Sequence, residues 1–391
     1  MKPKINFILS IWWKNNKISA IALLVCLILF IFAYNFANSD YEKTTLQGAY
    51  TLYETATIES ILSEDTYQEE LYENNYVGTQ TLLVKITSGD YKDSIMSATN
   101  YMSALYGTYL EAGDSIVAAL SVNEGEVYNV AVYEFNRTIP TLIILGLFVL
   151  ATVLIGGKKG AQSLLGLALT VVTLIWILVP LLIKGFPTLP TTLCVCIYVA
   201  IVCFILIGGI HKKSICAMLG TTGGLILATL FGLLSQAITR VNGMRMGDYV
   251  DALLQLKQGG TPLELSGLLI GGTMIASIGA IMDVAMSISS SMQELTIVNP
   301  SLTQKELWNS GMNIGRDMIG TMTNTLILAF VGSSFLLVIY IWTLHVPVYE
   351  LLSSTLVATE FVHSIASSMG VILSVPLTVL ICSISYSKKQ S

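Results

Sequence analysis

Long apolar runs limit what this chain can fold into. Eight segments of the 391-residue sequence approach or exceed the roughly 20 apolar residues that a helix needs to cross a hydrocarbon core of about 30 Å. Only 12% of the residues are charged, against about 25% in soluble domains, and the mean hydropathy is +0.70. We therefore predict an α-helical polytopic membrane protein with about eight transmembrane helices. The predicted spans are residues 18–38, 138–156, 161–183, 188–210, 215–238, 265–293, 318–343 and 363–385.

Basic residues between the spans predict the topology, because loops retained in the cytoplasm collect Lys and Arg. With both termini cytoplasmic, the basic groups of every second loop fall on the cytoplasmic side in an unbroken alternation; these groups are Lys2, Lys4, Lys14, Lys17, Lys158, Lys159, Lys212, Lys213, Lys305, Arg316, Lys388 and Lys389. The pattern is weakest in the fifth loop, where Arg240, Arg245 and Lys257 would lie outside, although acidic neighbours partly offset them. The first span is long and lacks an A-x-A-like cleavage site, so we expect an uncleaved anchor in the cell membrane.

Residues 39–137 contain no long apolar run and predict a small extracytoplasmic β-rich domain, a barrel or a sandwich. Three segments, 79–87, 115–122 and 126–135, have strand character and are separated by turn residues such as Gly89, Gly113 and Gly125. The more polar segment 59–76 is predicted as helical. The many Tyr and acidic residues indicate either a binding face or an ordinary solvated surface. The domains are then 1–38 (cytoplasmic N-terminus and anchor), 39–137, and 138–391 (seven-helix transmembrane domain).

The sequence offers little basis for an enzyme. It contains no P-loop, G-x-S-x-G, H-E-x-x-H or paired Cys-x-x-Cys, and we expect no catalytic activity and no nucleic-acid partner. All six cysteines fall in predicted spans, where small apolar packing is the expected role, although Cys194 and Cys196 also have the spacing of a soft-metal pair. Residues 246–256 have the apolar spacing of an amphipathic helix lying on the membrane surface.

A polar stripe runs along the predicted span 265–293. Residues three or four positions apart share one face of a helix. That face carries Ala276, Ala280, Asp283, Ser287, Ser290 and Glu294, with Gly272 and Gly279 nearby. Close packing against another helix would explain the small residues and the serines.

Helix packing does not explain Asp283, because an ionised aspartate at the centre of a membrane helix costs about 2.5–3.5 kcal/mol. No Lys or Arg is predicted in the middle of any span to pair with it. The carboxyl must be protonated, hydrated or holding a cation. Two interpretations stay open, a functional carboxylate and a structural, protonated group bonded to a serine or a backbone carbonyl.

The next span carries a second polar face. Asp317, Thr321 and Asn324 recur at helical spacing, and Gly315 and Gly320 predict a close approach to the preceding span. Carboxylate, hydroxyl and amide oxygens favour hard ions such as Mg²⁺, Ca²⁺, Mn²⁺ or Na⁺. The predicted metal ligands are Asp283, Ser287, Thr321 and Asn324, and the predicted transport or gating residues are Asp283, Ser290, Glu294, Asp317 and Glu360. Alternatively, Arg316 neutralises Asp317 or Glu294.

Other polar groups lie near the last span. Glu360 and His363 share a helix face, and His345 and Glu350 precede them, which indicates either a metal-collecting vestibule or solvated helix ends. Pro376 and Pro180 would bend or locally open their helices, or Pro180 marks a helix end.

The segments 279–295 (GAIMDVAMSISSSMQEL) and 315–332 (GRDMIGTMTNTLILAFVG) resemble the YibE/F family of bacterial multi-pass membrane proteins. The resemblance extends over residues 138–388 and more loosely to GDSIVAALSV and YEFNR. It implies a shorter paralogous membrane subunit as partner, but no established substrate. The residues that match the family's signature are Asp283, Ser287, Glu294, Asp317, Gly320, Thr321, Asn324, Thr325, Glu360, Gly370 and Pro376.

Three functions are compared on this basis. The first is a transporter or transporter subunit in which Asp283, Thr321 and Asn324 bind a cation or carry a proton. The second is an accessory or structural component that binds a paralogue, or a second copy, within membrane lipid and an extracytoplasmic factor through the β domain. The third, an intramembrane enzyme, is disfavoured because Asp283 and Asp317 lie at different predicted depths.

Overall fold

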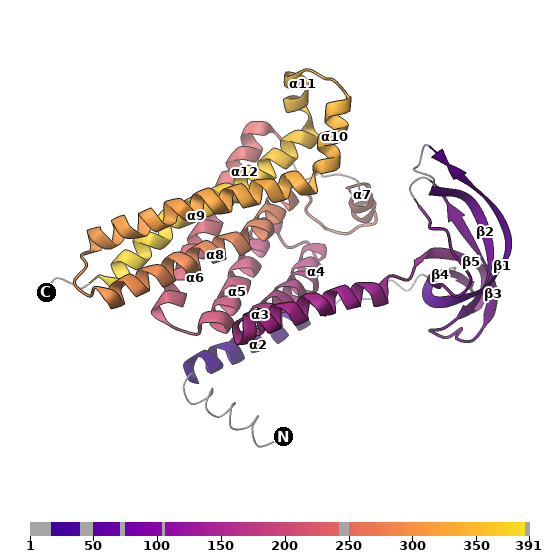
Figure 1. Cartoon of the computed structure of the whole chain (residues 1–391), viewed down its shortest axis with the longest axis horizontal. Helices are drawn as coiled ribbons and strands as arrows, with labels where there is room; N and C mark the ends of the chain where they lie inside the picture. Colours follow the sequence, from indigo (N-terminus) through magenta and orange to yellow (C-terminus); the bar gives the residue numbers. More distant parts are fainter. Residues whose placement is uncertain (1–16, 40–49, 71–74, 104–105, 242–249, 388–391) are drawn as a thin grey trace. The chain divides into compact units, whose positions relative to one another are not determined.

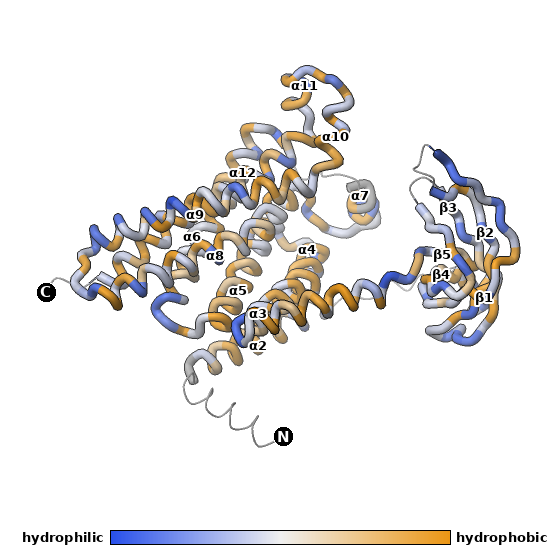
Figure 2. The backbone as a smooth tube through the Cα atoms, viewed as in Figure 1, coloured by the Kyte–Doolittle hydropathy of each residue, from blue (hydrophilic) through white to orange (hydrophobic). Residues whose placement is uncertain are grey.

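The computed structural model describes residues 17–39, 50–70, 75–103, 106–241 and 250–387. Contacts divide the chain into two units, which are described separately. The helical unit comprises Met1–Asp40 and Val153–Ser391, and the β unit comprises Tyr41–Thr152. Most of the helices are strongly hydrophobic along their length, whereas hydropathy alternates along the strands (Figure 2).

The β unit is a closed barrel of five strands in the order β1-β2-β3-β5-β4 (Figure 1). The strands are β1 (Tyr50–Glu69), β2 (Asn75–Ile86), β3 (Ile95–Met102), β4 (Ser115–Asn123) and β5 (Glu126–Phe135). All neighbours are antiparallel except β3 and β5, which are parallel and joined by the single pair Thr99 and Ala131. The β-rich prediction is confirmed.

The alternation of buried and half-buried residues along the strands identifies the core of the barrel. Leu82, Val84 and Ile86 of β2 are fully buried, as are Ile116, Ala118 and Leu120 of β4, while the alternate residues between them are only half-buried. Alternate side chains of a strand point to opposite faces, so each strand fills the barrel interior with every second residue. The described barrel therefore has its own hydrophobic core.

The helical prediction for residues 59–76 is wrong. Residues up to Glu69 continue β1, and Glu64–Glu69 pair with β2 in an unbroken antiparallel register; residues 71–74 lie outside the described part of the chain. Strand pairing satisfies the backbone of this polar segment, and β-branched Ile58, Ile61 and Thr66 favour the extended conformation. Strand β3 also falls in a segment for which no strand was predicted.

The helical unit consists of one N-terminal helix and a C-terminal series of helices. They are α2 (Lys17–Asn38), α3 (Thr138–Thr173, which begins in the β unit), the π-helical turn η2 (Leu174–Leu178), α4 (Val179–Ile183), α5 (Thr188–Gly208), α6 (Lys212–Thr239), α7 (Val250–Gln258), α8 (Leu268–Val298), α9 (Gln304–Ser333), α10 (Phe335–Thr343), α11 (Val348–Ser353) and α12 (Thr355–Tyr386). Helix α7 overlaps the predicted amphipathic helix, whose first four residues, 246–249, are not described.

Several of these helices are long and apolar enough to cross a membrane. Six qualify individually among the described residues, and a seventh forms if α9 and α10, which are bent by 63°, are counted together. This count takes residues 138–183 as one helical run, in which the predicted spans 138–156 and 161–183 lie on either side of Gly157. That run is broken by a kink at Gly157, whose φ of 55° is outside the helical region.

The two prolines behave differently. Pro180 is the second residue of α4, which follows η2 directly, and the wider turn of η2 locally opens the hydrogen-bond ladder, as predicted for this position. Helix α12 continues through Pro376 from Thr355 to Tyr386.

Small residues bring α6 and α12 into close contact. Gly220, Gly224 and Ala228 recur every four residues on α6, and they meet Thr378, Ser374 and Gly370 of α12 in antiparallel order. A Cβ placed on Gly224 would lie 2.6 Å from the Ser374 Cβ, and one on Gly370 would lie 2.7 Å from the Ala228 Cβ. We call these six residues the small-residue seam. Helix α8 packs on both helices, with Ile281 contacting the seam.

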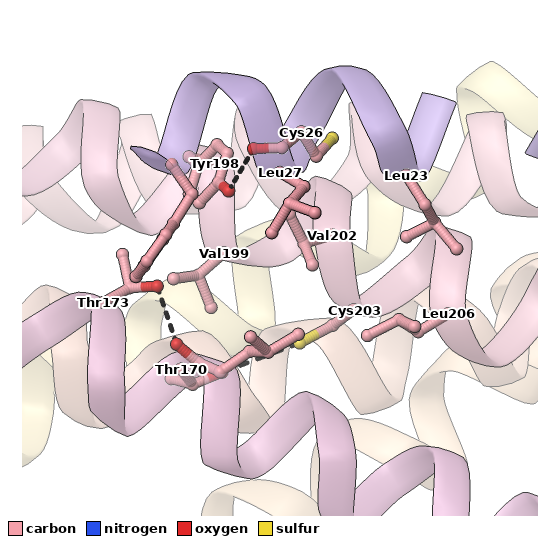
Figure 3. A pocket seen from close by; sticks show the side chains of 12 residues that line it. Leu23, Cys26, Leu27, Thr170, Thr173, Tyr198, Val199, Val202, Cys203 and Leu206 are labelled. Carbon is pink, nitrogen blue, oxygen red and sulfur yellow. Dashed lines mark hydrogen bonds between the residues drawn. The ribbon is translucent and has the colours of Figure 1, made fainter. Parts of the chain in front are cut away.

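The anchor helix α2 is part of the helical unit and packs on α5 and η2. The Tyr198 hydroxyl of α5 donates to the Cys26 carbonyl at 2.9 Å (Figure 3), and the Ser19 hydroxyl accepts from the Ile210 backbone N–H at 2.9 Å. Beside Tyr198 lies a mostly apolar cavity of about 190 Å³ between α2, α3 and α5. Its threonines, Thr170 and Thr173, bond back to carbonyls of their own helix, so it has the character of a packing void.

A carboxylate from a distant loop caps α5. Glu264 accepts a hydrogen bond from the Thr188 backbone N–H at 3.0 Å, while its own carbonyl accepts from the Thr188 hydroxyl at 2.9 Å. The first N–H groups of a helix have no partner within the helix, so an acceptor at this end stabilises it. This contact ties the α7–α8 connection to α5.

Replacing Gly224 by Ala is expected to destabilise the helical unit by about 1–3 kcal/mol, because the new methyl group overlaps Ser374. The measurement is the thermal unfolding midpoint of the purified protein in nanodiscs. Gly146→Ala in α3 is the control, since a Cβ there would meet nothing within 4 Å. An equal midpoint for the two variants would contradict the tight seam.

Replacing Glu264 by Ala is expected to lower stability by about 0.5–2 kcal/mol through loss of the α5 cap. Glu264→Gln keeps an acceptor oxygen and should lose less. The same thermal measurement applies, and the cap would be refuted if the two variants unfolded at the same temperature as the wild type.

Candidate functional site

Asp283 lies at the middle of α8, 15 residues from either end of this 31-residue helix. At 1.5 Å per residue each end is about 22 Å away, so a spanning α8 places the carboxyl deep in the hydrocarbon layer. The opposite face of α8 is fully buried through Ile281, Val284, Ile288 and Met292. The alternation of branched apolar and small polar residues thus decides which face enters the core.

The polar stripe of α8 faces away from this core. Ala276, Gly279, Asp283 and Glu294 are exposed, and Ser287 and Ser290 are half-buried. No hydrogen bond or ion pair joins Asp283 to another residue within the described part of the chain. One serine of this helix does bind a neighbour, since the Ser289 hydroxyl donates to the Lys213 carbonyl at 2.7 Å, but Ser289 belongs to the buried face.

Helix α9, like α8, has one buried packing face and one outward polar face. Leu307, Gly311 and Gly315 are buried against the unit, while Asp317, Thr321 and Asn324 are exposed. A capping box at Thr303 and Glu306 begins the helix. The Thr321 hydroxyl donates to the carbonyls of Asp317 and Met318, at 3.3 and 3.2 Å, and Thr325 donates to the Thr321 carbonyl at 2.9 Å. These two hydroxyls therefore bond back to their own helix and keep lone pairs available.

The contacts between α8 and α9 set the relative depths of the two stripes. A Cβ on Gly315 would lie 3.7 Å from Ile288, and one on Gly311 would lie 2.8 Å from Met292, so the helices run antiparallel with these pairs level. Moving five residues along each helix from Ile288 and Gly315 places Asp283 level with Gly320, next to Thr321. By the same counting Ser287 lies level with Arg316 and Asp317.

The two expected close approaches have different outcomes. Gly315 does allow close contact, chiefly with Val375 of α12. The expectation for Gly320 is wrong, because a Cβ there, as on Gly272 and Gly279, would meet no heavy atom within 4 Å. The reason is that the outward half of each helix has no neighbour among the described residues.

The structure does not show Arg316 neutralising Asp317 or Glu294, which was the alternative role predicted for it. Its guanidinium donates to the Asn313 side chain at 3.0 Å. The ion pairs of the described residues involve neither Arg316 with Asp317 nor Arg316 with Glu294. The acidic groups of both stripes therefore remain without a basic partner in this part of the chain.

The fit of a hard cation to these residues is partial. Asp283, Ser287, Thr321 and Asn324 supply the oxygen chemistry of such a site, but Ca²⁺ takes about six to eight oxygens and Mg²⁺ about six. No group of three or more His, Cys, Asp or Glu side chains with metal-binding placement occurs among the described residues. A full set of ligands would need water, substrate or a second subunit.

Glu360 lies at the break between α9 and α10. Its carboxylate accepts from the Ser334 hydroxyl at 2.8 Å, at the residue where the helix bends by 63°. The two groups line a largely apolar groove of about 420 Å³ formed by α9, α10, α11 and α12. Nearby, the His363 ring lies 4.8 Å from the Phe330 ring, and its buried Nε2 has no hydrogen-bond partner among the described residues.

The expected vestibule is not assembled as one cluster. His345 and Glu350 are exposed in and before α11, and they form no metal-binding group with Glu360 and His363 in the described structure. The bend at Ser334 was not predicted, although the run Gly332-Ser333-Ser334 is typical of helix kinks. The small-residue seam was also missed; its signal was the four-residue spacing of Gly220, Gly224 and Ala228.

Five of the six cysteines have the expected packing role. All six are free; Cys194 is exposed, the other five are buried, and Cys196 lies within the hydrophobic core. The soft-metal alternative for Cys194 and Cys196 gains no third ligand among the described residues.

Comparison with known proteins identifies the helical region. A family model described as YibE/F-like protein matches residues 144–388, a segment that includes both polar stripes and the small-residue seam and leaves out the strands of the barrel. No curated protein and no solved structure matches the chain. The matched segment covers more than half of the sequence, and the chain therefore belongs to the YibE/F-like family.

Proposed function

We propose that this chain is a subunit of a membrane transporter whose polar pathway is lined by α8 and α9 and completed by a second subunit. The observation that carries the proposal is Asp283, midway along an apolar helix, on the outer surface and without a partner among the described residues. An unpaired carboxylate exposed to hydrocarbon is unfavourable by about 2.5–3.5 kcal/mol or more, so it must face water, an ion or another protein.

The stripes support a hard cation or a proton-coupled solute as cargo. Asp283 and Ser287 on α8 lie at depths comparable with Thr321 and Asp317 on α9, and all provide oxygen. Ser290, Glu294, Asn324 and Asp317 continue the polar surface toward both ends. Glu360, bonded to Ser334 at the bend, is a candidate gating residue because a broken helix can change its angle at one hinge.

A second family member is the proposed partner, either a shorter paralogue or another copy of this chain. Lipid cannot hydrogen-bond Asp317, Thr321 and Asn324, which face outward along α9. A partner helix could complete the incomplete set of ligands described above. The basic-residue pattern supports both termini on the cytoplasmic side of the cell membrane and the β unit on the other side.

The alternative is a non-catalytic accessory component. The outward stripe of α9 favours it as well, because small and hydroxyl-bearing residues at exposed positions also suit a permanent helix interface. In that case the β unit would bind an extracytoplasmic factor, and Asp283 would be a hydrogen-bonding group at the interface.

Replacing Asp283 by Asn keeps shape and hydrogen bonding but removes the charge and the titratable proton. We expect normal protein levels in the membrane together with altered growth under metal stress and altered cellular ion content. Asp90→Asn, in an exposed loop of the β unit, is the control and should behave as the wild type. An unchanged cellular ion content in the Asp283→Asn variant would contradict the transport proposal.

A photo-crosslinking residue placed at Asn324 is expected to capture a second YibE/F-like chain in the membrane. The same residue at Leu147, an exposed apolar position of α3, should capture lipid only. Mass spectrometry of the products identifies the partner. Lipid adducts alone from position 324 would show that the α9 stripe is not a subunit interface.

A further inference from the structure

The β unit has a pocket where the barrel seam is weakest. Strands β3 and β5 are joined by the pair Thr99 and Ala131, and residues of the segment 106–110, which follows β3, line the pocket together with both strands. The pocket there has a volume of about 340 Å³, within the usual range of about 300–1,000 Å³ for small-ligand sites. Its lining is contributed by β3, β5 and this connecting segment alone.

Buried amides hold the pocket in shape. Asn100, which lines it, is only 2% exposed and donates from Nδ2 to the Gln80 side chain and to the Thr108 carbonyl, both at 3.0 Å. Gln80 is fully buried and bonds both the N–H and the carbonyl of Leu110. Gly107, at φ 85°, passes against β3 where a Cβ would lie 2.9 Å from the Met102 Cα. The floor is therefore pre-organised.

Three tyrosines surround this floor with their rings in solvent. Tyr101, Tyr106 and Tyr133 are 66%, 73% and 61% exposed, and the Tyr133 ring packs edge-on against the Tyr53 ring, which leaves Tyr101 and Tyr106 as the tyrosines available to a ligand. A tyrosine presents an apolar face and a hydroxyl at once, with little conformational entropy to lose. This combination suits a ligand that also has apolar CH faces and hydroxyl groups.

The charges around the pocket disfavour anionic and strongly cationic ligands. Glu134 in the lining is neutralised by Arg137 at 2.7 Å, and Arg137 also reaches the Thr108 hydroxyl at 3.4 Å. The described part of the β unit otherwise has only Lys85 and Lys92 as basic residues, against thirteen acidic ones. Like charges repel, so an anionic ligand is disfavoured, while the pocket itself has no unpaired charge to attract a strong cation. The acidic residues are Glu54, Glu59, Glu64, Asp65, Glu69, Glu70, Asp90, Asp93, Glu111, Asp114, Glu124, Glu126 and Glu134.

We infer that this pocket binds an uncharged sugar unit of an oligosaccharide or polysaccharide. Tyr101 and Tyr106 stack on the sugar ring, and Thr108 and Glu134 provide hydrogen bonds to its hydroxyls. A concave site with fixed polar groups favours a small cyclic ligand over the flat contact of a protein partner. The inference goes beyond the proposed transport function and uses none of its residues.

The test uses the full chain in nanodiscs, because detergents with sugar head groups would compete for the pocket. Neutral oligomers of glucose, mannose and N-acetylglucosamine are titrated, with a galacturonate trimer as the anionic comparison. At least one neutral oligomer is expected to bind with a Kd in or below the millimolar range, and the galacturonate trimer is not. Asp283→Asn should bind sugar as the wild type does, which separates this test from that of transport.

Point variants test whether the sugar binds at this pocket. Tyr101→Ala and Tyr106→Ala should each weaken binding by about tenfold or more, and Tyr106→Phe, which keeps the ring, should retain most of it. The matched control is Tyr128→Ala, because Tyr128 is 65% exposed on the same strand as Tyr133 but does not line the pocket. Thermal unfolding verifies that each variant is folded.

Several results would overturn the proposal. They are no binding of any neutral oligomer at about 10 mM, equal binding of the galacturonate trimer, or an equal loss in Tyr128→Ala. Binding of peptides in place of sugars at this pocket would also overturn it, and would identify the site as a protein interface.

Discussion

Close packing of α6 against α12 is the contact on which the helical unit depends. Lipid tails are as apolar as leucine side chains, so burial of apolar surface gives membrane helices little reason to associate, and van der Waals contact between closely spaced backbones becomes important. Gly220, Gly224 and Ala228 provide that spacing against Gly370, Ser374 and Thr378. Helix α8 lies against this pair with Ile281 and Ile288, and α9 follows through Gly315.

The position of the polar stripes is a consequence of this packing. The branched apolar face of α8 packs against α5, α6 and α12. Asp283 and the serines of the polar stripe therefore lie on the opposite face of the helix. Helix α9 likewise uses Gly311 and Gly315 to pack and leaves Asp317 and Asn324 outside. The same contacts that stabilise the unit thus leave an outer polar surface that no other described part of the chain covers. This uncovered surface is the reason for proposing a second subunit.

The two units differ in the burial and hydrogen bonding of their polar side chains. In the barrel the amides Gln80 and Asn100 are buried but bonded, and they fix a loop in place. In the helices Asp283 is unbonded within the described residues but exposed. Buried polar groups with complete hydrogen bonds specify a local shape, whereas unsatisfied groups on a surface indicate a missing partner, ion or water. The two units therefore point to two different kinds of ligand.

The sequence by itself determined the membrane class, the β-rich unit and the identity of the polar stripes, because hydrophobic length and periodicity are local properties of the chain. It also placed Asp283 midway along its helix. What only the tertiary structure decided was which faces meet: that Gly315 packs while Gly320 stays open, that Glu264 caps α5, and that Ser334 bends the α9–α10 run beside Glu360. Residues 59–69 became a strand because β2 was available to pair with them, a partner that no local pattern reveals. These outcomes depend on contacts between segments far apart in the chain, and the spacing of residues within one segment does not specify its neighbour.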